Sequence, residues 1–239
     1  RDLIDARRIA LLGPQVYLIN ASRGGIVDEN AMVEALEANR ARLRGIAVIG
    51  LEASDAERAA LQAAGVVGLR LNVLYGGGIG LAQVENYAAL CKDMGWHLQF
   101  LVDARQLPEL APRLSKLPVP FLIDHVGHFP TSAGVDHKGF QTLLSLLRDG
   151  AWVRLSGAYR NTVEGPPYRD TIPFARAAIE AAPDRCVWGS DWPHVANWGV
   201  MMSVCDLLDL LADWAPDNTL RDRILVDNPQ RLFGFPAVT

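Results

Sequence analysis

Polar residues able to do chemistry follow two of the most apolar stretches of this chain. Asp124 and His125 come directly after "PVPFLI", and Asp191 follows "CVWGS", with His194 three residues later. A carboxylate can act as a general base, and a neutral histidine can pass a proton or polarise a carbonyl group. We therefore predict Asp191 as general base and His125 as its proton partner. Taken alone, His125 would suit a structural role equally well.

Polar side chains near two further strand-like runs indicate a binding site for an anion. Arg70 and Asn72 lie within the otherwise apolar "VVGLRLN", and Tyr159 and Arg160 follow "AWVRLS". An arginine in a strand is costly to bury without a partner or an anion, and a guanidinium pairs well with a carboxylate. We predict that these four residues and His194 contact a small carboxylate substrate. The alternatives are a structural ion pair for Arg70 and a surface position for Arg160.

Other kinds of site are less well supported. His125, Asp191 and His194 are the one plausible set of metal ligands, and the sequence contains no H-x-H, so zinc or another divalent metal is only weakly favoured. The sequence also lacks the G-x-S-x-G of a serine nucleophile. The glycine-rich run at 76–80, "GGGIG", lacks the third glycine of a dinucleotide-binding turn. We therefore predict no cofactor.

Composition and charge narrow the class of protein. The chain has 239 residues, half of them hydrophobic, and a net charge of −4 without a basic run, so nucleic acid is not an expected partner. Its three cysteines are widely spaced, as is typical of reduced thiols in a cytoplasmic protein. No apolar run is long enough to span a bilayer and no signal peptide is visible, so we expect no membrane association.

Strand-like and helical stretches alternate along the chain, which predicts a parallel α/β sheet covered by helices. The expected strands are apolar on both faces and lie at 16–20, 45–49, 66–72, 97–102, 119–124, 151–156 and 185–191. Helices are expected after Asp28, from the capping box at 54–57 to Gly65, and at 81–94, 139–148, 172–182 and in two C-terminal stretches. The candidate site residues then follow strand ends, where active sites of α/β barrels and doubly wound sheets lie.

From about residue 43 to residue 235 the chain resembles the amidohydrolase superfamily, in particular its branch of 2-pyrone-4,6-dicarboxylate lactonases. The resemblance is carried by "RLRGIAV", "GVVGLRLN", "GWHLQF", "PVPFLIDHVGH", "WVRLSGAYR", "GPPY", "RCVWGSDWPH" and "LVDNPQRLFGF". It implies a TIM-like (β/α) barrel that hydrolyses a lactone, ester or amide of a small carboxylic acid. It also implies that Asp191 activates water, that His125 matches the histidine after the "ID" strand, and that Arg70 and Arg160 bind a substrate carboxylate. The lactonase works without a divalent metal, whereas many relatives bind one.

The chain departs from this pattern in two places. The lactonase has a second arginine shortly after the R-x-N strand, where this chain has "VLYGGGIG". The family also begins with a strand ending in H-x-H, and counting back from Asp191 makes 16–20 the second strand. We therefore predict an incomplete barrel, its first strand missing or replaced, with residues 1–239 as a single domain and 1–42 as an atypical strand–helix segment. A helix at 1–12 or a second copy of the chain, in a homo-oligomer, would cover the open seam.

Residues 1–36 resemble a different family, the D-2-hydroxyacid dehydrogenases, through "LLGPQVYLINASRGGIVDENAMVEAL". By this resemblance Arg23 matches an arginine that binds a substrate carboxylate. The dinucleotide glycine motif and the later glutamate and histidine of that family are missing from the sequence, and hydride transfer needs the cofactor. Three interpretations follow: a lactonase-type hydrolase, a chimeric or catalytically crippled barrel, and a dehydrogenase fragment without its cofactor site. We favour the first.

Overall fold

The described part of the chain forms a parallel sheet of six strands. The computed structural model describes residues 29–74, 80–195, 197 and 199–236. Its strands are β1 (Gly45–Ala47), β2 (Val66–Asn72), β3 (His97–Leu101), β4 (Phe121–Ile123), β5 (Trp152–Leu155) and β6 (Cys186–Trp188). Each lies within a predicted strand, which confirms six of the seven predictions. The seventh, at 16–20, lies outside the described residues.

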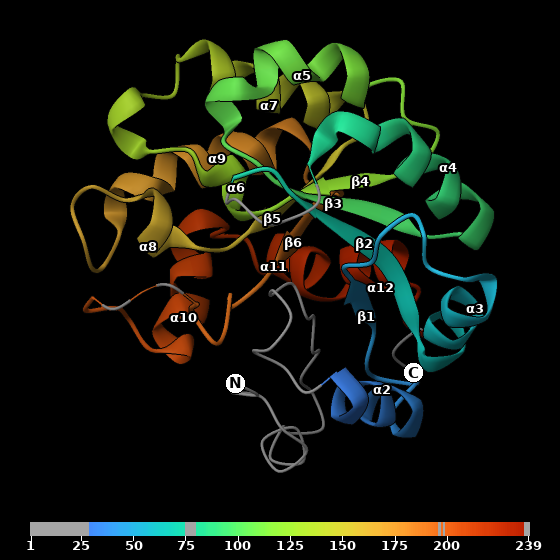
Figure 1. The fold of residues 1–239 in the computed structure, drawn as a ribbon. Coiled ribbons are helices and arrows are strands. Elements are labelled where there is room, and N and C mark those ends of the chain that lie inside the picture. The colour runs from blue at the N-terminus through green and yellow to red at the C-terminus, as the bar shows by residue number, and fades with distance from the viewer. Residues whose placement is uncertain (1–28, 75–79, 196, 198, 237–239) are drawn as a thin grey trace.

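The order of these strands identifies the architecture. Each strand pairs in parallel with the next one along the chain, from β1 to β6, without a reversal. An open doubly wound sheet reverses its strand order at a switch point, whereas a barrel keeps it. The sheet curls as a part of a barrel wall does (Figure 1). The predicted α/β fold of the TIM-barrel type is therefore confirmed.

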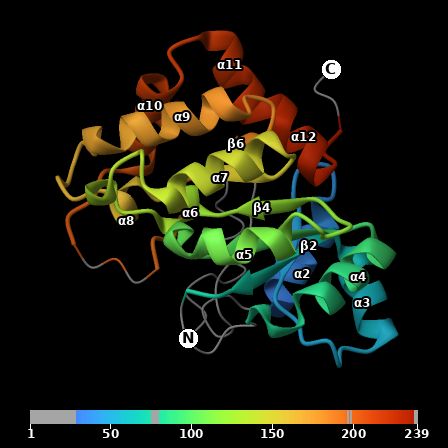
Figure 2. The same cartoon turned by 90° about the horizontal axis from the view of Figure 1, so that it is seen from above.

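Helices follow the strands and pack around the outside of the curled sheet (Figures 1 and 2). The longer ones are α2 (Glu29–Ala38), α3 (Asp55–Ala64), α4 (Val84–Met94), α5 (Leu107–Leu114), α7 (Lys138–Arg148), α9 (Ile172–Ala181) and α10 (Val204–Trp214). The sequence analysis named no helix at α5. The last predicted helical stretch is divided into α11 (Asn218–Asp222), a π-helical turn (Arg223–Asp227) and α12 (Asn228–Phe233). Two one-turn helices, α6 (His125–His128) and α8 (Ala158–Asn161), lie at the site.

Local sequence signals set several helix ends. The Ser54 hydroxyl accepts a hydrogen bond from the backbone N–H of Glu57, and Gly65 ends α3 in a left-handed conformation, with φ of 112°. A complete capping box, which the sequence analysis did not identify, starts α10: Ser203 and Asp206 each accept from the other's backbone N–H. The predicted cap Asp28 lies outside the described residues.

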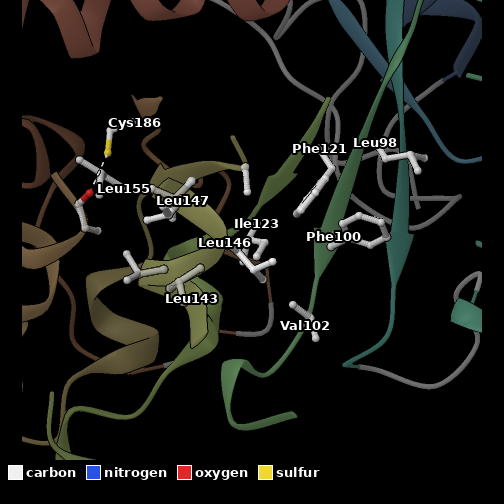
Figure 3. Packing of buried hydrophobic residues seen from close by; sticks show 14 of the residues in the cluster. Leu98, Phe100, Val102, Phe121, Ile123, Leu143, Leu146, Leu147, Leu155 and Cys186 are labelled. Atoms are coloured by element: carbon white, nitrogen blue, oxygen red, sulfur yellow. Dashed lines mark hydrogen bonds between the residues drawn. The ribbon is translucent and has the colours of Figure 1, made fainter. Parts of the chain in front are cut away.

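The hydrophobic core lies between the outer face of the sheet and these helices. Leucines of α7 face Ile123 of β4 (Figure 3). The outward side chains alternate with inward ones, as the period of a strand requires, and are nearly all fully buried. They include Leu69, Leu71, Leu98, Phe100, Phe121, Ile123, Val153, Leu155 and Cys186.

The inner face of the sheet is polar at its centre, which corrects the expectation of strands apolar on both faces. Arg70, Gln99 and Arg154 point inward from β2, β3 and β5, and all three are buried. Towards its amino end the inner face is apolar, and there Phe233 of α12 packs in one cluster with Leu122, Trp152 and Val187. A covered interior therefore does not have to be apolar, because its polar groups can pair with one another.

The edges of the described sheet are β1 and β6. The helix predicted for residues 1–12, and with it the covering of the barrel seam, lies outside the described residues. Among the helices of the described ranges, none is long and apolar enough to cross a membrane.

Candidate active site

Polar side chains that follow three strands, β4, β5 and β6, meet on one side of the sheet. The centre of the group is Asp191, three residues after β6. Its Oδ2 atom accepts hydrogen bonds from the Tyr159 hydroxyl at 2.5 Å and from Arg160 Nε at 2.6 Å. Its Oδ1 atom lies 3.6 Å from His125 Nε2. The structure therefore brings together Asp191, His125, Tyr159 and Arg160.

An unusual backbone presents these groups. His125, Val126, Gly127 and His128 have φ values of 54°, 52°, 72° and 48°, so α6 is a left-handed turn. Each non-glycine residue costs about 1–2 kcal/mol in this conformation. The Asn161 side-chain amide donates to the carbonyl of His125 at 2.9 Å and holds the turn. Strained backbone of this kind is common where side chains must be aimed at a reaction.

His125 is held in a buried, neutral form. Its Nδ1 atom lies 2.8 Å from the Ser156 hydroxyl, and its ring packs edge-on against that of His128, with 5.0 Å between the ring centroids. Burial lowers the pKa of His125 to about 4, against the opposing influence of Asp191 and Asp124. Burial likewise lowers the pKa of His128 to about 3. His128 and Ser156 were not among the predicted site residues, although they lie in the same strand-end motifs, "LIDHVGH" and "VRLSGAYR", as His125 and Arg160.

The surroundings of Asp191 favour its ionised form. Burial by itself raises the pKa of its carboxyl group, but His125, Arg160 and the hydrogen bond from Tyr159 outweigh burial and lower the pKa to about 2. Conversely, burial and the neighbouring Asp191 charge raise the pKa of Tyr159, so its hydroxyl stays protonated and donates. The carboxylate is therefore charged but strongly stabilised, which makes it a weak base in this arrangement.

A second carboxylate lies beneath the first within the sheet. Asp124, fully buried, accepts from Arg154 Nη1 at 2.6 Å, and its other oxygen lies 3.1 Å from Arg70 Nη2. Arg154 also donates to the Gln99 side-chain oxygen at 3.2 Å, and Gln99 in turn contacts His97 at 3.0 Å. Arg154 was not predicted as a site residue, although it carries the same signal in the sequence as Arg70: a charge within an apolar strand.

The remaining predicted residues occupy the margin of this group. Arg70 forms a structural ion pair, the alternative to substrate binding given above, and its partner is Asp124. Asn72 accepts from the backbone N–H of Leu74 through its side-chain oxygen at 3.1 Å. His194 stacks edge-on against Tyr159, with ring centroids 5.6 Å apart. Arg160 is not a surface residue, because its side chain is 13% exposed.

Gly157 leaves the space that the His125 ring occupies. A Cβ atom at this glycine would lie 3.0 Å from His125 Nδ1, and the φ of Gly157 is +64°. We expect Gly157→Ala to destabilise the protein by about 1–2 kcal/mol, the cost of a left-handed alanine, and to displace His125. The measurement is urea denaturation together with turnover. Gly95→Ala is the matched control: Gly95 ends α4 in the same left-handed conformation, with φ of +67°, and nothing lies within 4 Å of the added Cβ. It should lose similar stability but keep activity, and equal losses of activity would contradict the role given to Gly157.

The fold agrees with the comparison to known proteins. The amidohydrolase family model matches residues 21–235, and the chain belongs to that family. The 4-sulfomuconolactone hydrolase of Hydrogenophaga intermedia is 37% identical over 216 residues, which are 88% of this chain and 71% of that protein. A probable 2-pyrone-4,6-dicarboxylic acid hydrolase of Acinetobacter baumannii, solved with citric acid bound, is 29% identical with a TM-score of 0.77, covering 92% and 83% of the two chains.

The match also bears on the N-terminal resemblance. The family model begins at residue 21, within the segment that resembles the dehydrogenases, so the amidohydrolase relationship extends into it. The dehydrogenase-like character of residues 1–36 gains no support from these comparisons and stays a prediction, as does the role of Arg23.

Metal binding occurs within this fold: an amidohydrolase of Burkholderia multivorans, solved with zinc, shares the fold at 21% identity, with a TM-score of 0.73 and coverage of 92% and 83%. The described residues of this chain do not fit a metal. They contain no group of three or more His, Cys, Asp or Glu side chains able to hold one. One oxygen of Asp191 already accepts from the Arg160 guanidinium, whose charge opposes a cation beside it. The mechanism below therefore uses the side chains alone.

Proposed function

We propose that this protein hydrolyses the lactone, or a related ester or amide, of a small carboxylic acid. The observation that carries the proposal is the pair formed by ionised Asp191 and neutral His125, with 3.6 Å between Asp191 Oδ1 and His125 Nε2, just after strands β6 and β4. The names of its relatives supply the substrate class, since one acts on a sulfomuconolactone and another is a probable pyrone-dicarboxylic acid hydrolase.

The side chains have distinct parts in this reaction. Asp191 Oδ1 takes a proton from water while the water oxygen bonds to the lactone carbonyl carbon. The ring C–O bond of the resulting tetrahedral intermediate then breaks, and the alkoxide formed takes up a proton, so that a hydroxy acid leaves. His125, with Nδ1 on Ser156, directs Nε2 towards Asp191 Oδ1, so the neutral ring can receive the proton that Asp191 took from water and pass it to the leaving oxygen, which returns both side chains to their starting forms. Its low pKa makes the neutral ring the resting form.

Binding of the substrate carboxylate falls to the arginines in this proposal. Arg70 and Arg154 are each 6% exposed and are fixed to Asp124, so they provide a positive field from beneath. The two guanidinium groups and the single carboxylate of Asp124 together carry a net charge of +1. Arg160, more exposed than either, is the arginine that can meet the substrate directly, beside Tyr159 and His194. Asn72 lies at the end of β2 on the same side.

The test is a panel of lactones and simple esters of small carboxylic acids, each followed by release of acid. Turnover of at least one lactone that bears a carboxylate is expected. If none is hydrolysed, the catalytically crippled barrel is the better interpretation. Release of acid that persists unchanged after Asp191→Asn would exclude Asp191 as the group that activates water.

The pH dependence of kcat/KM follows from the two lowered pKa values. Asp191 is deprotonated above about pH 2 and His125 is neutral above about pH 4. Activity should therefore fall only as the pH drops through about 4, where His125 gains a proton, and should be level from there to neutral pH. The measurement is kcat/KM for one lactone from pH 3.5 to 8 in buffers of constant ionic strength, corrected for uncatalysed hydrolysis. A loss of kcat/KM as the pH falls through about 6.5, the ordinary pKa of histidine, would contradict a buried neutral His125.

A further inference from the structure

Three arginines reach the site, and they differ in what holds them. Arg70 and Arg154 are bound to Asp124, which is fully buried, so the departure of either would leave a buried carboxylate with one counter-charge fewer. Arg160 stands on the one-turn helix α8 and is the least buried of the three. Its Nη2 atom donates to the carbonyl of Val195 at 3.0 Å, in the loop after β6, where Val195 is 37% exposed. Arg160 is therefore the arginine whose partners can be exchanged.

The partner that Arg160 holds is the proposed general base. Its Nε atom donates to Asp191 Oδ2 at 2.6 Å, while the Tyr159 hydroxyl donates to the same oxygen at 2.5 Å. A carboxylate that accepts two short charge-assisted or hydroxyl hydrogen bonds is a poor acceptor for a further proton. In this arrangement the base is restrained by the residue that would also bind the substrate.

We propose that Arg160 is a latch on Asp191: the anionic group of the substrate draws the guanidinium away from the carboxylate and so makes Asp191 a competent base. This inference rests on the proposed hydrolase function. In this proposal the anionic group of the substrate raises the rate of the chemical step and also contributes to binding. Tyr159, which lacks a charge, stays on Asp191 Oδ2 and keeps the carboxylate oriented while Oδ1 takes the proton from water.

The latch explains how the site selects its substrate. A neutral lactone that enters the site leaves Arg160 on Asp191, so it binds against a restrained base and turns over slowly. A lactone with a carboxylate or sulfonate exchanges one anionic partner of Arg160 for another, at little electrostatic cost. Discrimination should therefore be seen in kcat, whereas an arginine that only binds would affect mainly KM.

The experiment compares a lactone that bears a carboxylate with its carboxamide, which has the same shape without the charge. With Arg160→Gln, we expect kcat for the carboxamide to rise about three- to tenfold, because removal of a neighbouring positive charge raises the basicity of a carboxylate. The same variant should lose at least about tenfold in kcat/KM for the carboxylate substrate. Arg160→Lys, which keeps a charge beside Asp191, should not raise turnover of the carboxamide.

A second arm supplies the anion separately. Acetate added to the wild-type protein should speed hydrolysis of the carboxamide relative to chloride at the same ionic strength, and should have no such effect on Arg160→Gln. Arg113→Gln is the matched control, since Arg113 also pairs with a carboxylate, Glu85, but at a remote surface. It should behave as the wild type with both substrates, and circular dichroism checks the fold of each variant.

The outcomes separate the latch from the proposed function. If wild-type protein hydrolyses neither lactone, the proposed function fails and the latch with it. If it hydrolyses the carboxylate substrate but Arg160→Gln shows no gain with the carboxamide, or acetate acts no differently from chloride, the latch is overturned and the hydrolase remains. A gain with the carboxamide together with acetate activation that depends on Arg160 supports it.

Discussion

Asp191→Asn should lower kcat for a lactone substrate by about 10²–10⁴-fold, the range expected when a general base is removed. The amide has nearly the shape of the carboxylate and can still accept from Tyr159 and Arg160, which both contact Asp191 Oδ2. It cannot take a proton from water. We therefore expect KM to change by much less than kcat. The measurement is steady-state kinetics on the substrate with the highest turnover.

The control for this variant is Asp209→Asn, an exposed aspartate on α10 outside the site. It removes the same charge from the protein and should leave both kcat and KM unchanged. A variant Asp191→Asn with undiminished kcat would remove Asp191 from the mechanism, and a large rise in KM at constant kcat would make it a binding residue instead.

Asp124→Asn should lower the free energy of unfolding by about 3–5 kcal/mol, the cost of breaking a buried ion pair from one side. The carboxylate is fully buried between Arg154 and Arg70, at 2.6 and 3.1 Å. Its removal leaves two guanidinium groups within the sheet without a counter-charge. Urea denaturation followed by circular dichroism measures the loss. Glu85→Gln, which breaks the exposed pair with Arg113, should leave the free energy of unfolding nearly unchanged.

The pH dependence of stability provides an independent check on Asp124. Burial raises the pKa of this carboxyl group, but Arg154 and Arg70 outweigh it and hold the pKa below its ordinary value. A carboxyl group with a lowered pKa stabilises the folded state fully above its unfolded pKa of about 4, and the contribution is lost as the pH falls through the lowered value. The wild-type protein should lose this stability on acidification, whereas Asp124→Asn should lack this part of the dependence. Equal acid sensitivity of the two proteins would mean that Asp124 is not the group responsible.

The positions of the elements were predictable because their signals are local. Alternating apolar runs located all six described strands, and Ser54 and Gly65 mark the ends of α3 through hydrogen bonds within a few residues. The helix α5 was not predicted; it contains Pro108 and Pro112, which weaken a helical pattern. Polar residues at strand ends also indicated the site, since parallel strands bring their carboxyl ends to one side.

The sequence by itself determined the class of fold, the pair Asp191 and His125 as site candidates, and the arginines as anion-binding candidates. Only the tertiary structure decided how those charges are paired. Arg154 reaches Asp124 across 30 residues and Arg160 reaches Asp191 across 31. Such pairs depend on the register between strands and on the left-handed turn at His125, which no local pattern specifies. The same arginine signal therefore describes a buried counter-charge to Asp124 at Arg70 and a hydrogen-bond donor to Asp191 at Arg160.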